Sequence, residues 1–318
     1  MSNNQKKLFP VGTTFGIEGV PDSIKVEGLA KPSPMTPQVE HHVFDTDFLS
    51  DVLAWMRIGG SDGLLIKGPT GSGKTSGITQ VFARLNLPLV QVTCHADMEI
   101  PELVGHQTVV DGDLVFMDGP LTTAMRMGRP LLMNEIDYLN PGTASGLNQI
   151  LDGGYLIIPE NGGEVVKPAE GFKLIATANT AGGGDETGMY LGTQQQNMAL
   201  MDRFWVLELG YMKPEAEEAV VQAAAPKLNA PVVAKMVEMA NQVRSMFMGE
   251  NSGNGAIEVT MSTRTLVRWA KMSVFFGLKA KKGINPIEYS LERALGNRAS
   301  PETREALREL CQRHFDGL

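Results

Sequence analysis

The sequence predicts an α/β domain built on a parallel sheet, with two hairpin insertions, followed by an all-helical domain. Up to about residue 211, short apolar runs alternate with segments of helical periodicity, which is typical of a parallel sheet with crossover helices. A glycine-rich loop lies between the first of these runs and a helix. After residue 211 only helical periodicity remains.

Composition and charge narrow the class of protein. The 318 residues suffice for two domains, and 42% hydrophobic with 20% charged residues is ordinary for a globular protein. A net charge of −8 disfavours binding to nucleic acid through its phosphates. Two distant cysteines, a polar amino terminus and no long apolar run predict a cytoplasmic protein without a membrane anchor.

The glycine-rich loop is the most informative motif. The sequence GPTGSGKT fits the phosphate-binding pattern Gly-x-x-x-x-Gly-Lys-Thr at every fixed position, between an apolar run at 63–67 and a helical pattern at 74–85. Glycines let successive N–H groups point at a triphosphate, the lysine adds a positive charge, and the threonine hydroxyl suits Mg²⁺. The pattern predicts binding of ATP or GTP. The predicted binding residues are Gly68, Pro69, Thr70, Gly71, Ser72, Gly73, Lys74 and Thr75.

The first 45 residues hold five prolines and show little periodicity, which predicts an extended amino-terminal arm or a disordered tail. If the arm is ordered, its apolar side chains are candidate anchors: Phe9, Phe15, Ile17 and Val26. A helix is expected next, from an N-cap at Thr46 to the stop at 59–60. Its predicted apolar face is Phe48, Leu49, Val52, Leu53 and Met56.

The middle of the chain predicts strands at 89–93, 130–137, 172–179 and 204–209. Between them we expect a short helix at 99–105, a hairpin turning at Asp111-Gly112, helices at 120–128 and 141–152, and a second hairpin around 161–163. The glycine-rich run 182–192 is expected to be a mobile loop. Predicted helices at 214–225, 230–248, 262–277, 286–295 and 301–315 make up the last part. Basic residues outnumber acidic ones only after residue 211, so we expect domains at 1–45, 46–211 and 212–318.

These features together resemble an AAA+ ATPase, and the two hairpins resemble the MoxR group. The resemblance covers about residues 46 to 295. The run Thr187–Phe204 and the segment Thr14–Glu18 are most similar to the ATPase subunits of cobaltochelatases, with CbbQ- and NorQ-like proteins as relatives. The resemblance implies an AAA+ P-loop core with a helical lid, ATP and Mg²⁺ as ligands, and a homo-oligomeric ring. The sequence does not set the number of subunits, and the family implies a hexamer.

By the same resemblance, Glu135 activates the attacking water, and Asn179 and Arg264 act as the first and second sensors. Arg203, at the edge of the sheet's active face, would be an arginine finger that reaches a neighbour's nucleotide; phosphoryl transfer needs such cations. The plainer alternatives are a strand-end cap for Asn179, a surface ion pair for Arg203 and a solvent-facing helix residue for Arg264.

Asn134 departs from the family pattern, in which an aspartate for Mg²⁺ is usual. An amide brings no charge, so weaker metal binding and slow hydrolysis are expected. Asp137 can compensate only if it is still on the strand.

Three functions follow from these features. The first is a ring ATPase that remodels a protein partner, by resemblance one with a von Willebrand A-type domain. Relatives of this kind activate Rubisco or nitric oxide reductase or help build gas vesicles. The second is a nucleotide-gated scaffold with little turnover. The third, a nucleic-acid motor like restriction-system ATPases, is disfavoured because both hairpins are acidic.

Overall fold

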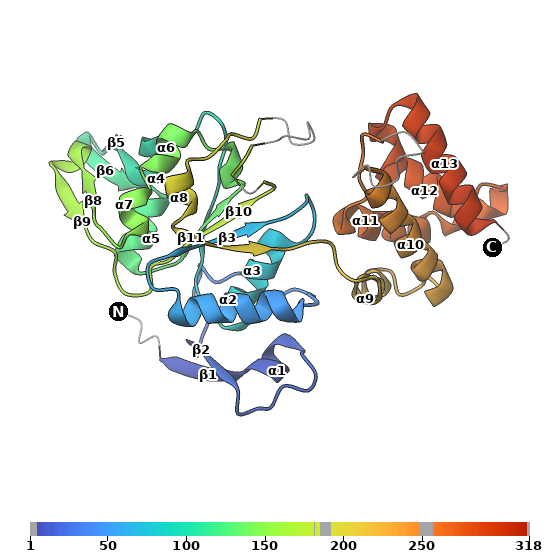
Figure 1. The fold of residues 1–318 in the computed structure, drawn as a ribbon, viewed down its shortest axis with the longest axis horizontal. Helices are drawn as coiled ribbons and strands as arrows, with labels where there is room; N and C mark the ends of the chain where they lie inside the picture. Colours follow the sequence, from blue (N-terminus) through green and yellow to red (C-terminus); the bar gives the residue numbers. More distant parts are fainter. Residues whose placement is uncertain (1–4, 181, 185–191, 248–256, 317–318) are drawn as a thin grey trace. The chain divides into compact units, whose positions relative to one another are not determined.

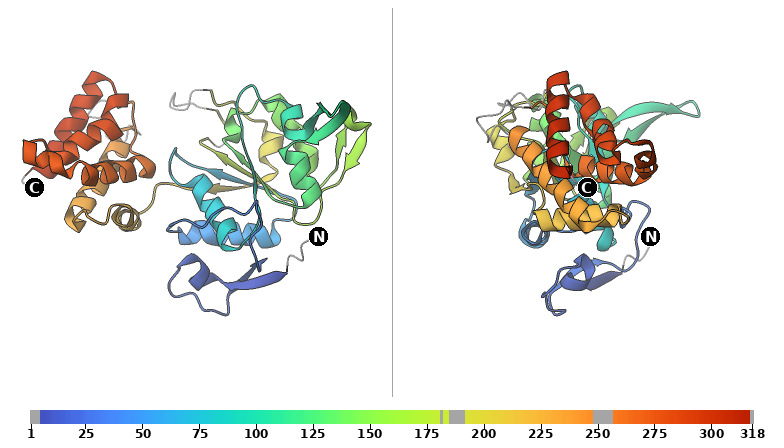
Figure 2. Two further views of the ribbon diagram at one scale, coloured as in Figure 1. Left: turned by 180° about the vertical axis from the view of Figure 1, so that it is seen from behind. Right: turned by 90° about the vertical axis from the view of Figure 1, so that its right-hand side faces the viewer.

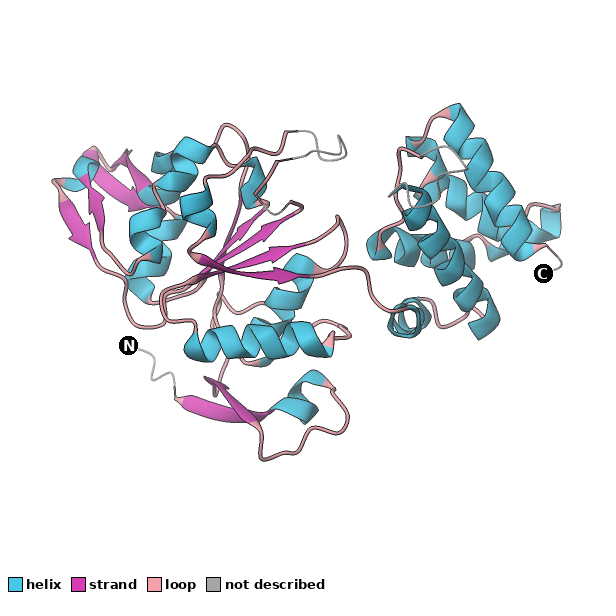
Figure 3. Cartoon of the chain, viewed as in Figure 1, coloured by secondary structure: helices cyan, strands magenta, loops and turns pink. Residues whose placement is uncertain are grey.

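The structure is a computed structural model that describes residues 5–180, 182–184, 192–247 and 257–316. The chain divides into two compact units. The first comprises residues up to 69 and 74–209, and the second comprises 70–73 and 210–318. The first unit holds a parallel sheet with helices and the second is helical, so the predicted fold class is confirmed (Figures 1 and 3). The three predicted domains stay a prediction.

The central sheet of the first unit has five parallel strands. Their order is β11-β3-β10-β7-β4. Their bounds are β3 Gly63–Lys67, β4 Val90–Thr93, β7 Leu131–Asn134, β10 Leu174–Ala178 and β11 Phe204–Glu208. All four pairings are parallel, so the carboxyl ends of β3, β10 and β7 lie at one edge.

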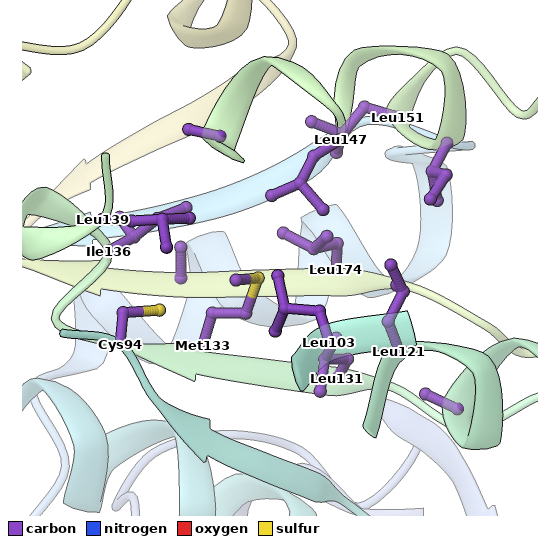
Figure 4. Packing of buried hydrophobic residues seen from close by; sticks show 14 of the residues in the cluster. Cys94, Leu103, Leu121, Leu131, Met133, Ile136, Leu139, Leu147, Leu151 and Leu174 are labelled. Atoms are coloured by element: carbon purple, nitrogen blue, oxygen red, sulfur yellow. The ribbon is translucent and has the colours of Figure 1, made fainter. Parts of the chain in front are cut away.

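Helices cover both faces of this sheet because successive strand residues point to opposite sides. On one face, α2 (Thr46–Ile58) and α3 (Lys74–Arg84) pack on Leu64 and Ile66 (Figure 2). On the other face, α4 (Ile100–Val104) and α5 (Pro120–Met127) contribute Leu103 and Leu121 to a core that includes Leu65 (Figure 4). The apolar positions of the helical pattern at 74–85 are all buried, namely Ile78, Val81, Phe82 and Leu85.

Two antiparallel hairpins are inserted into this fold, as predicted. The first pairs β5 (Gly105–Val110) with β6 (Asp113–Asp118), and the second pairs β8 (Leu156–Ile158) with β9 (Glu164–Val166). Arg126 of α5 links them, because its guanidinium lies 2.8 Å from Asp118 of the first hairpin and 2.6 Å from Glu164 of the second. The short 3₁₀ turn Pro159–Asn161 lies at the tip of the second hairpin.

From residue 5 the amino-terminal segment is folded, so the alternative of a disordered tail is wrong, and the arm contains strands and a short helix. Strands β1 (Lys6–Pro10) and β2 (Lys25–Leu29) pair antiparallel, and α1 (Val11–Phe15) lies between them in sequence. Phe15 is buried in the same core as α2 and α3, and the other three predicted anchors pack against that core. Burial of these apolar side chains offsets the entropy lost when the segment becomes ordered.

Two details of the predicted helices are also wrong. The cap of α2 is Asp45 rather than Thr46, because its carboxylate accepts the N–H groups of Asp47 and Phe48. The predicted helix 141–152 is two short helices, α6 (Pro141–Ser145) and α7 (Asn148–Leu151). Between them, at Gly146 and Leu147, the backbone hydrogen bonds shorten to three-residue spacing, and glycine is a weak helix former.

The last part of the first unit contains two short helical elements, the 3₁₀ turn η1 (Ile136–Tyr138) and α8 (Met198–Met201). The predicted glycine-rich loop 182–192 lies largely outside the described residues. None of the described helices is long and apolar enough to cross a membrane.

The described residues of the second unit form five α-helices with a core of their own (Figure 3). They are α9 (Pro214–Ala224), α10 (Ala230–Phe247), α11 (Thr263–Phe275), α12 (Pro286–Ala294) and α13 (Pro301–Phe315), with 3₁₀ turns at Gly277–Lys282 and Gly296–Arg298. A buried ion pair joins α9 to α10, in which Arg244 Nη2 lies 2.7 Å from Glu217 Oε1. The predicted helices are confirmed to within a few residues at each end.

Candidate functional site

The candidate site lies at the carboxyl edge of the parallel sheet. Ala178 at the end of β10 pairs with Lys67 at the end of β3, and β7 lies on the other side of β10. The segments that follow these strands are the glycine-rich loop, the Asn134-Glu135 pair and Asn179. Three motifs that are far apart in sequence therefore meet at one edge.

The loop has the backbone that the glycines were predicted to allow. Gly71 has φ 72° and Gly73 has φ 99°, a region that residues with a side chain rarely adopt. Lys74 begins α3, and its ammonium Nζ lies 2.7 Å from Gly68 O and 3.0 Å from Pro69 O. The lysine charge is thus held at the base of the loop.

Asn179 is joined directly to this lysine. Lys74 Nζ donates a hydrogen bond to Asn179 Oδ1 at 3.0 Å. The side-chain amide of Asn179 therefore faces the loop, which is the placement expected of a group that senses a bound phosphate. The plainer alternative, a cap on its own strand, does not account for this contact.

Thr75 and Asn134 form the second contact between the loop and a strand end. Thr75 Oγ1 donates to Asn134 Oδ1 at 2.8 Å, and Thr177 Oγ1 lies 3.4 Å from the same oxygen. The two predicted metal-site residues are therefore adjacent. Both offer neutral oxygen atoms.

Glu135 is exposed and has a left-handed backbone with φ 59°. Its N–H donates to Thr177 Oγ1 at 3.1 Å, which helps to hold that conformation. A glutamate in this region is strained, and such strain gathers at functional sites. The sequence alone does not predict this left-handed backbone at Glu135.

Asp137 has left the strand, so it does not meet the condition stated for compensating Asn134. It lies in η1, beyond the end of β7, and is 1% exposed. Its carboxylate accepts the N–H groups of Asn179 and Thr180, just beyond the end of β10. Burial raises the pKa of Asp137, and the hydrogen bonds from Asn179 and Thr180 oppose that rise.

Arg203 lies where the parallel strands begin, at the opposite end of the sheet from the glycine-rich loop. Its expected position beside the loop is therefore wrong. Its carbonyl accepts the N–H of Gly63, and the next residue pairs with Gly63 at the start of β3. The five residues of β11 separate it from the loop's edge by about 16 Å. Its guanidinium forms a two-bond ion pair with Asp152, at 2.8 Å for each bond, and lowers the pKa of that carboxyl.

Arg264 belongs to the second unit. It is exposed in the first turn of α11, one residue after the helix begins. Ser262 caps that helix by accepting the N–H of Thr265.

The side chains at the sheet edge fit a nucleotide with Mg²⁺. Mg²⁺ prefers oxygen ligands and is held in such sites by one or two protein groups, waters and substrate phosphates. Thr75 Oγ1 and Asn134 Oδ1 supply such oxygens beside the lysine that would neutralise phosphate charge. Across the described ranges, no group of three or more His, Cys, Asp or Glu side chains could hold a metal without a substrate.

Each of the two units matches a known domain family. Residues 63–204 match the AAA domain of the dynein-related subfamily, and residues 217–314 match the CbbQ/NirQ/NorQ C-terminal domain. The chain is 32% identical to the aerobic cobaltochelatase subunit CobS of a Sinorhizobium species, over 87% of this chain and 83% of CobS.

Two further similarities are more distant. An uncharacterised Staphylococcus haemolyticus protein is 29% identical over 79% of this chain and 90% of its own length. A RuvB variant of Thermotoga maritima superposes with a TM-score of 0.48 at 13% identity, covering 75% of this chain and 65% of that chain. On its domain matches and its likeness to CobS, the chain belongs to the AAA+ ATPases of the CobS and CbbQ type.

Proposed function

We propose that this protein is a ring-forming ATPase that hydrolyses ATP at the glycine-rich loop and uses the cycle to remodel or activate a protein partner in the cytoplasm. One observation carries the proposal. Lys74 contacts Asn179 at 3.0 Å and Thr75 contacts Asn134 at 2.8 Å, so the loop is joined to both strand ends that hydrolysis requires.

Each residue at the edge has a chemical task in this proposal. Lys74 and the backbone N–H groups of the glycine-rich loop bind the phosphates, and Thr75 and Asn134 would hold Mg²⁺. Mg²⁺ would supply charge neutralisation on the phosphate oxygens. Glu135 accepts a proton from the attacking water, and Asn179 orients that water or the terminal phosphate.

Two arginines complete the proposed machinery. Arg203 serves a neighbouring subunit, because its own loop is a full strand length away. In that role it exchanges Asp152 for a phosphate of the neighbour. Arg264 couples the helical unit to the nucleotide. Oligomers of this kind would be rings, with six subunits as the expected number.

Turnover should be slow, because Asn134 lacks the negative charge of an aspartate. The same residue supports a second candidate function, a scaffold that binds nucleotide and assembles with little hydrolysis. Glu135 favours the ATPase, since a scaffold has no need of a strained glutamate beside the loop.

The partner is proposed from the likeness to CobS, which is named as a cobaltochelatase subunit. We propose a client protein with a von Willebrand A-type domain and a role in metal insertion. A nucleic-acid partner is disfavoured, because the hairpin turns carry Asp111, Asp113 and Glu160.

Lys74→Ala tests the proposal. Loss of the ammonium should weaken ATP binding at least tenfold, an effect of about 1.4 kcal/mol or more, measured by calorimetry. Lys67→Ala is the matched control, because Lys67 ends β3 just before the loop but pairs with Glu208 at 2.9 Å. Equal ATP affinity in the folded Lys74→Ala and Lys67→Ala proteins would refute the site.

A further inference from the structure

We infer that Asp137 is a positioning residue that holds Asn179 in the orientation needed for ATP hydrolysis. The inference rests on the proposed function, because it assigns Asn179 a task in turnover. It adds a residue beyond the Asn134-Glu135 pair and ties the end of β7 to the end of β10 through a side chain.

The geometry forms a continuous chain of contacts. Asp137 Oδ2 accepts the backbone N–H of Asn179 at 2.7 Å and that of Thr180 at 3.2 Å. The side chain of Asn179 then accepts the bond from Lys74 Nζ at 3.0 Å. One carboxylate oxygen therefore fixes the backbone at the point where the Asn179 side chain turns toward the loop.

The turn that carries Asp137 is itself firmly held. Ile136 and Leu139 on either side are buried in the core of the sheet's face (Figure 4). The carbonyl of Asp137 accepts the N–H of Gln194 at 2.7 Å. A residue fixed in this way can impose its position on the strand end that it contacts.

A contribution to stability alone does not explain why the carboxylate of Asp137 is buried here. Asp137 is 1% exposed, and its second oxygen, Oδ1, has no hydrogen-bond partner within the described part of the chain. Burying a carboxylate with one oxygen unpaired is costly. Such a cost is expected where a polar group serves an active site.

Removing the carboxylate should therefore affect turnover more than binding. Asp137→Ala leaves Lys74 and the glycine-rich loop intact, so the Kd for nucleotide should change by less than about threefold. The backbone at 179–180 loses its two bonds and the Asn179 amide loses its fixed orientation. Misplacement of a catalytic group can reduce kcat by about 10- to 100-fold.

The experiment compares kcat for ATP and Kd for the non-hydrolysable analogue adenylyl imidodiphosphate in the full chain. Thr122→Val is the matched control, because it also removes a buried bond between a side chain and the backbone, in which Thr122 Oγ1 donates to Val104 O at 2.6 Å. Thr122 lies on α5, outside the nucleotide site. Asp137→Asn keeps an oxygen that can accept both N–H groups and should retain most of kcat.

A double-mutant cycle separates positioning from general destabilisation. If Asp137 acts through Asn179, Asp137→Ala should cost nothing further in an Asn179→Ala background. Three outcomes would each overturn the inference. They are a kcat in the double variant reduced by the product of the two single losses, an equal loss of kcat in Thr122→Val, and an unchanged kcat in Asp137→Ala. If Asp137→Ala does not fold, Asp137→Ser takes its place in the cycle, because its hydroxyl is too short to reach both N–H groups.

The parent protein and Lys74→Ala are assayed alongside. If the parent hydrolyses ATP and Lys74→Ala does not, the proposed function is supported, whatever the result for the Asp137 variants. If the parent shows no such turnover, the proposed function fails, and the inference about Asp137 fails with it.

Discussion

At the scale of single residues, the contacts at the loop depend on side chains that sequence motifs identify only in part. The positions of Lys74, Thr75, Asn134 and Asn179 follow from the glycine motif and from strand ends, since parallel strands bring their carboxyl ends together. The strained backbone of Glu135 was not predictable, because it depends on a hydrogen bond to Thr177, 42 positions away.

Asn134→Asp tests the metal role at this scale. A carboxylate beside Thr75 adds about 2 kcal/mol of attraction to the doubly charged Mg²⁺ at water-like dielectric, so half-maximal hydrolysis should need about 30-fold less Mg²⁺. The measurement is phosphate release across a Mg²⁺ titration at saturating ATP.

Asn140→Asp is the control for that substitution. It adds the same charge at the exposed cap of α6, where aspartate also caps well. An unchanged or higher Mg²⁺ requirement in Asn134→Asp would mean that residue 134 does not face the metal.

At the scale of elements, local signals predicted well and long-range contacts did not. The hairpin at Asp111-Gly112 was predictable because its turn residues determine it, with φ 53° and 93°. The ordered amino-terminal segment was not, because its order comes from Phe15 packing on a core made by later helices. The break between α6 and α7 near Gly146 was not predictable either. It comes from a change to hydrogen bonds three residues apart, which the spacing of apolar residues does not reveal.

The buried pair of α9 and α10 gives a prediction for the helical unit. Glu217 is 0% exposed and pairs with Arg244, whose Nε also donates to Met261 O at 2.7 Å. Glu217→Ala leaves a buried guanidinium without its carboxylate and should destabilise the unit by about 3–5 kcal/mol. Peptide-resolved hydrogen exchange of residues 214–247 measures this loss within the helical unit alone.

Glu215→Ala is the matched control for Glu217→Ala. Glu215 lies in the same first turn of α9 but is exposed. Equal protection in the two variants would show that the ion pair adds nothing to the stability of the helices.

At the scale of the whole molecule, the sheet separates the parts of the proposed catalytic machinery. Glu135 lies at the carboxyl edge, and Arg203 lies at the amino end of β11. Because Arg203 lies about 16 Å from the loop's end of its own sheet, we propose that it serves another subunit's site. The family resemblance predicted this sharing between subunits, but the position within the sheet became clear only from the strand register.

Mixing two inactive variants tests this central claim most directly. Arg203→Ala subunits keep Glu135, and Glu135→Gln subunits keep Arg203, so each should bind ATP and hydrolyse little alone. In mixed rings some sites pair an intact Glu135 with an intact Arg203 from the neighbour, so phosphate release at fixed total protein should rise to a maximum at intermediate ratios. A flat line at the level of the single variants, with rings confirmed by light scattering, would contradict a ring ATPase with shared sites.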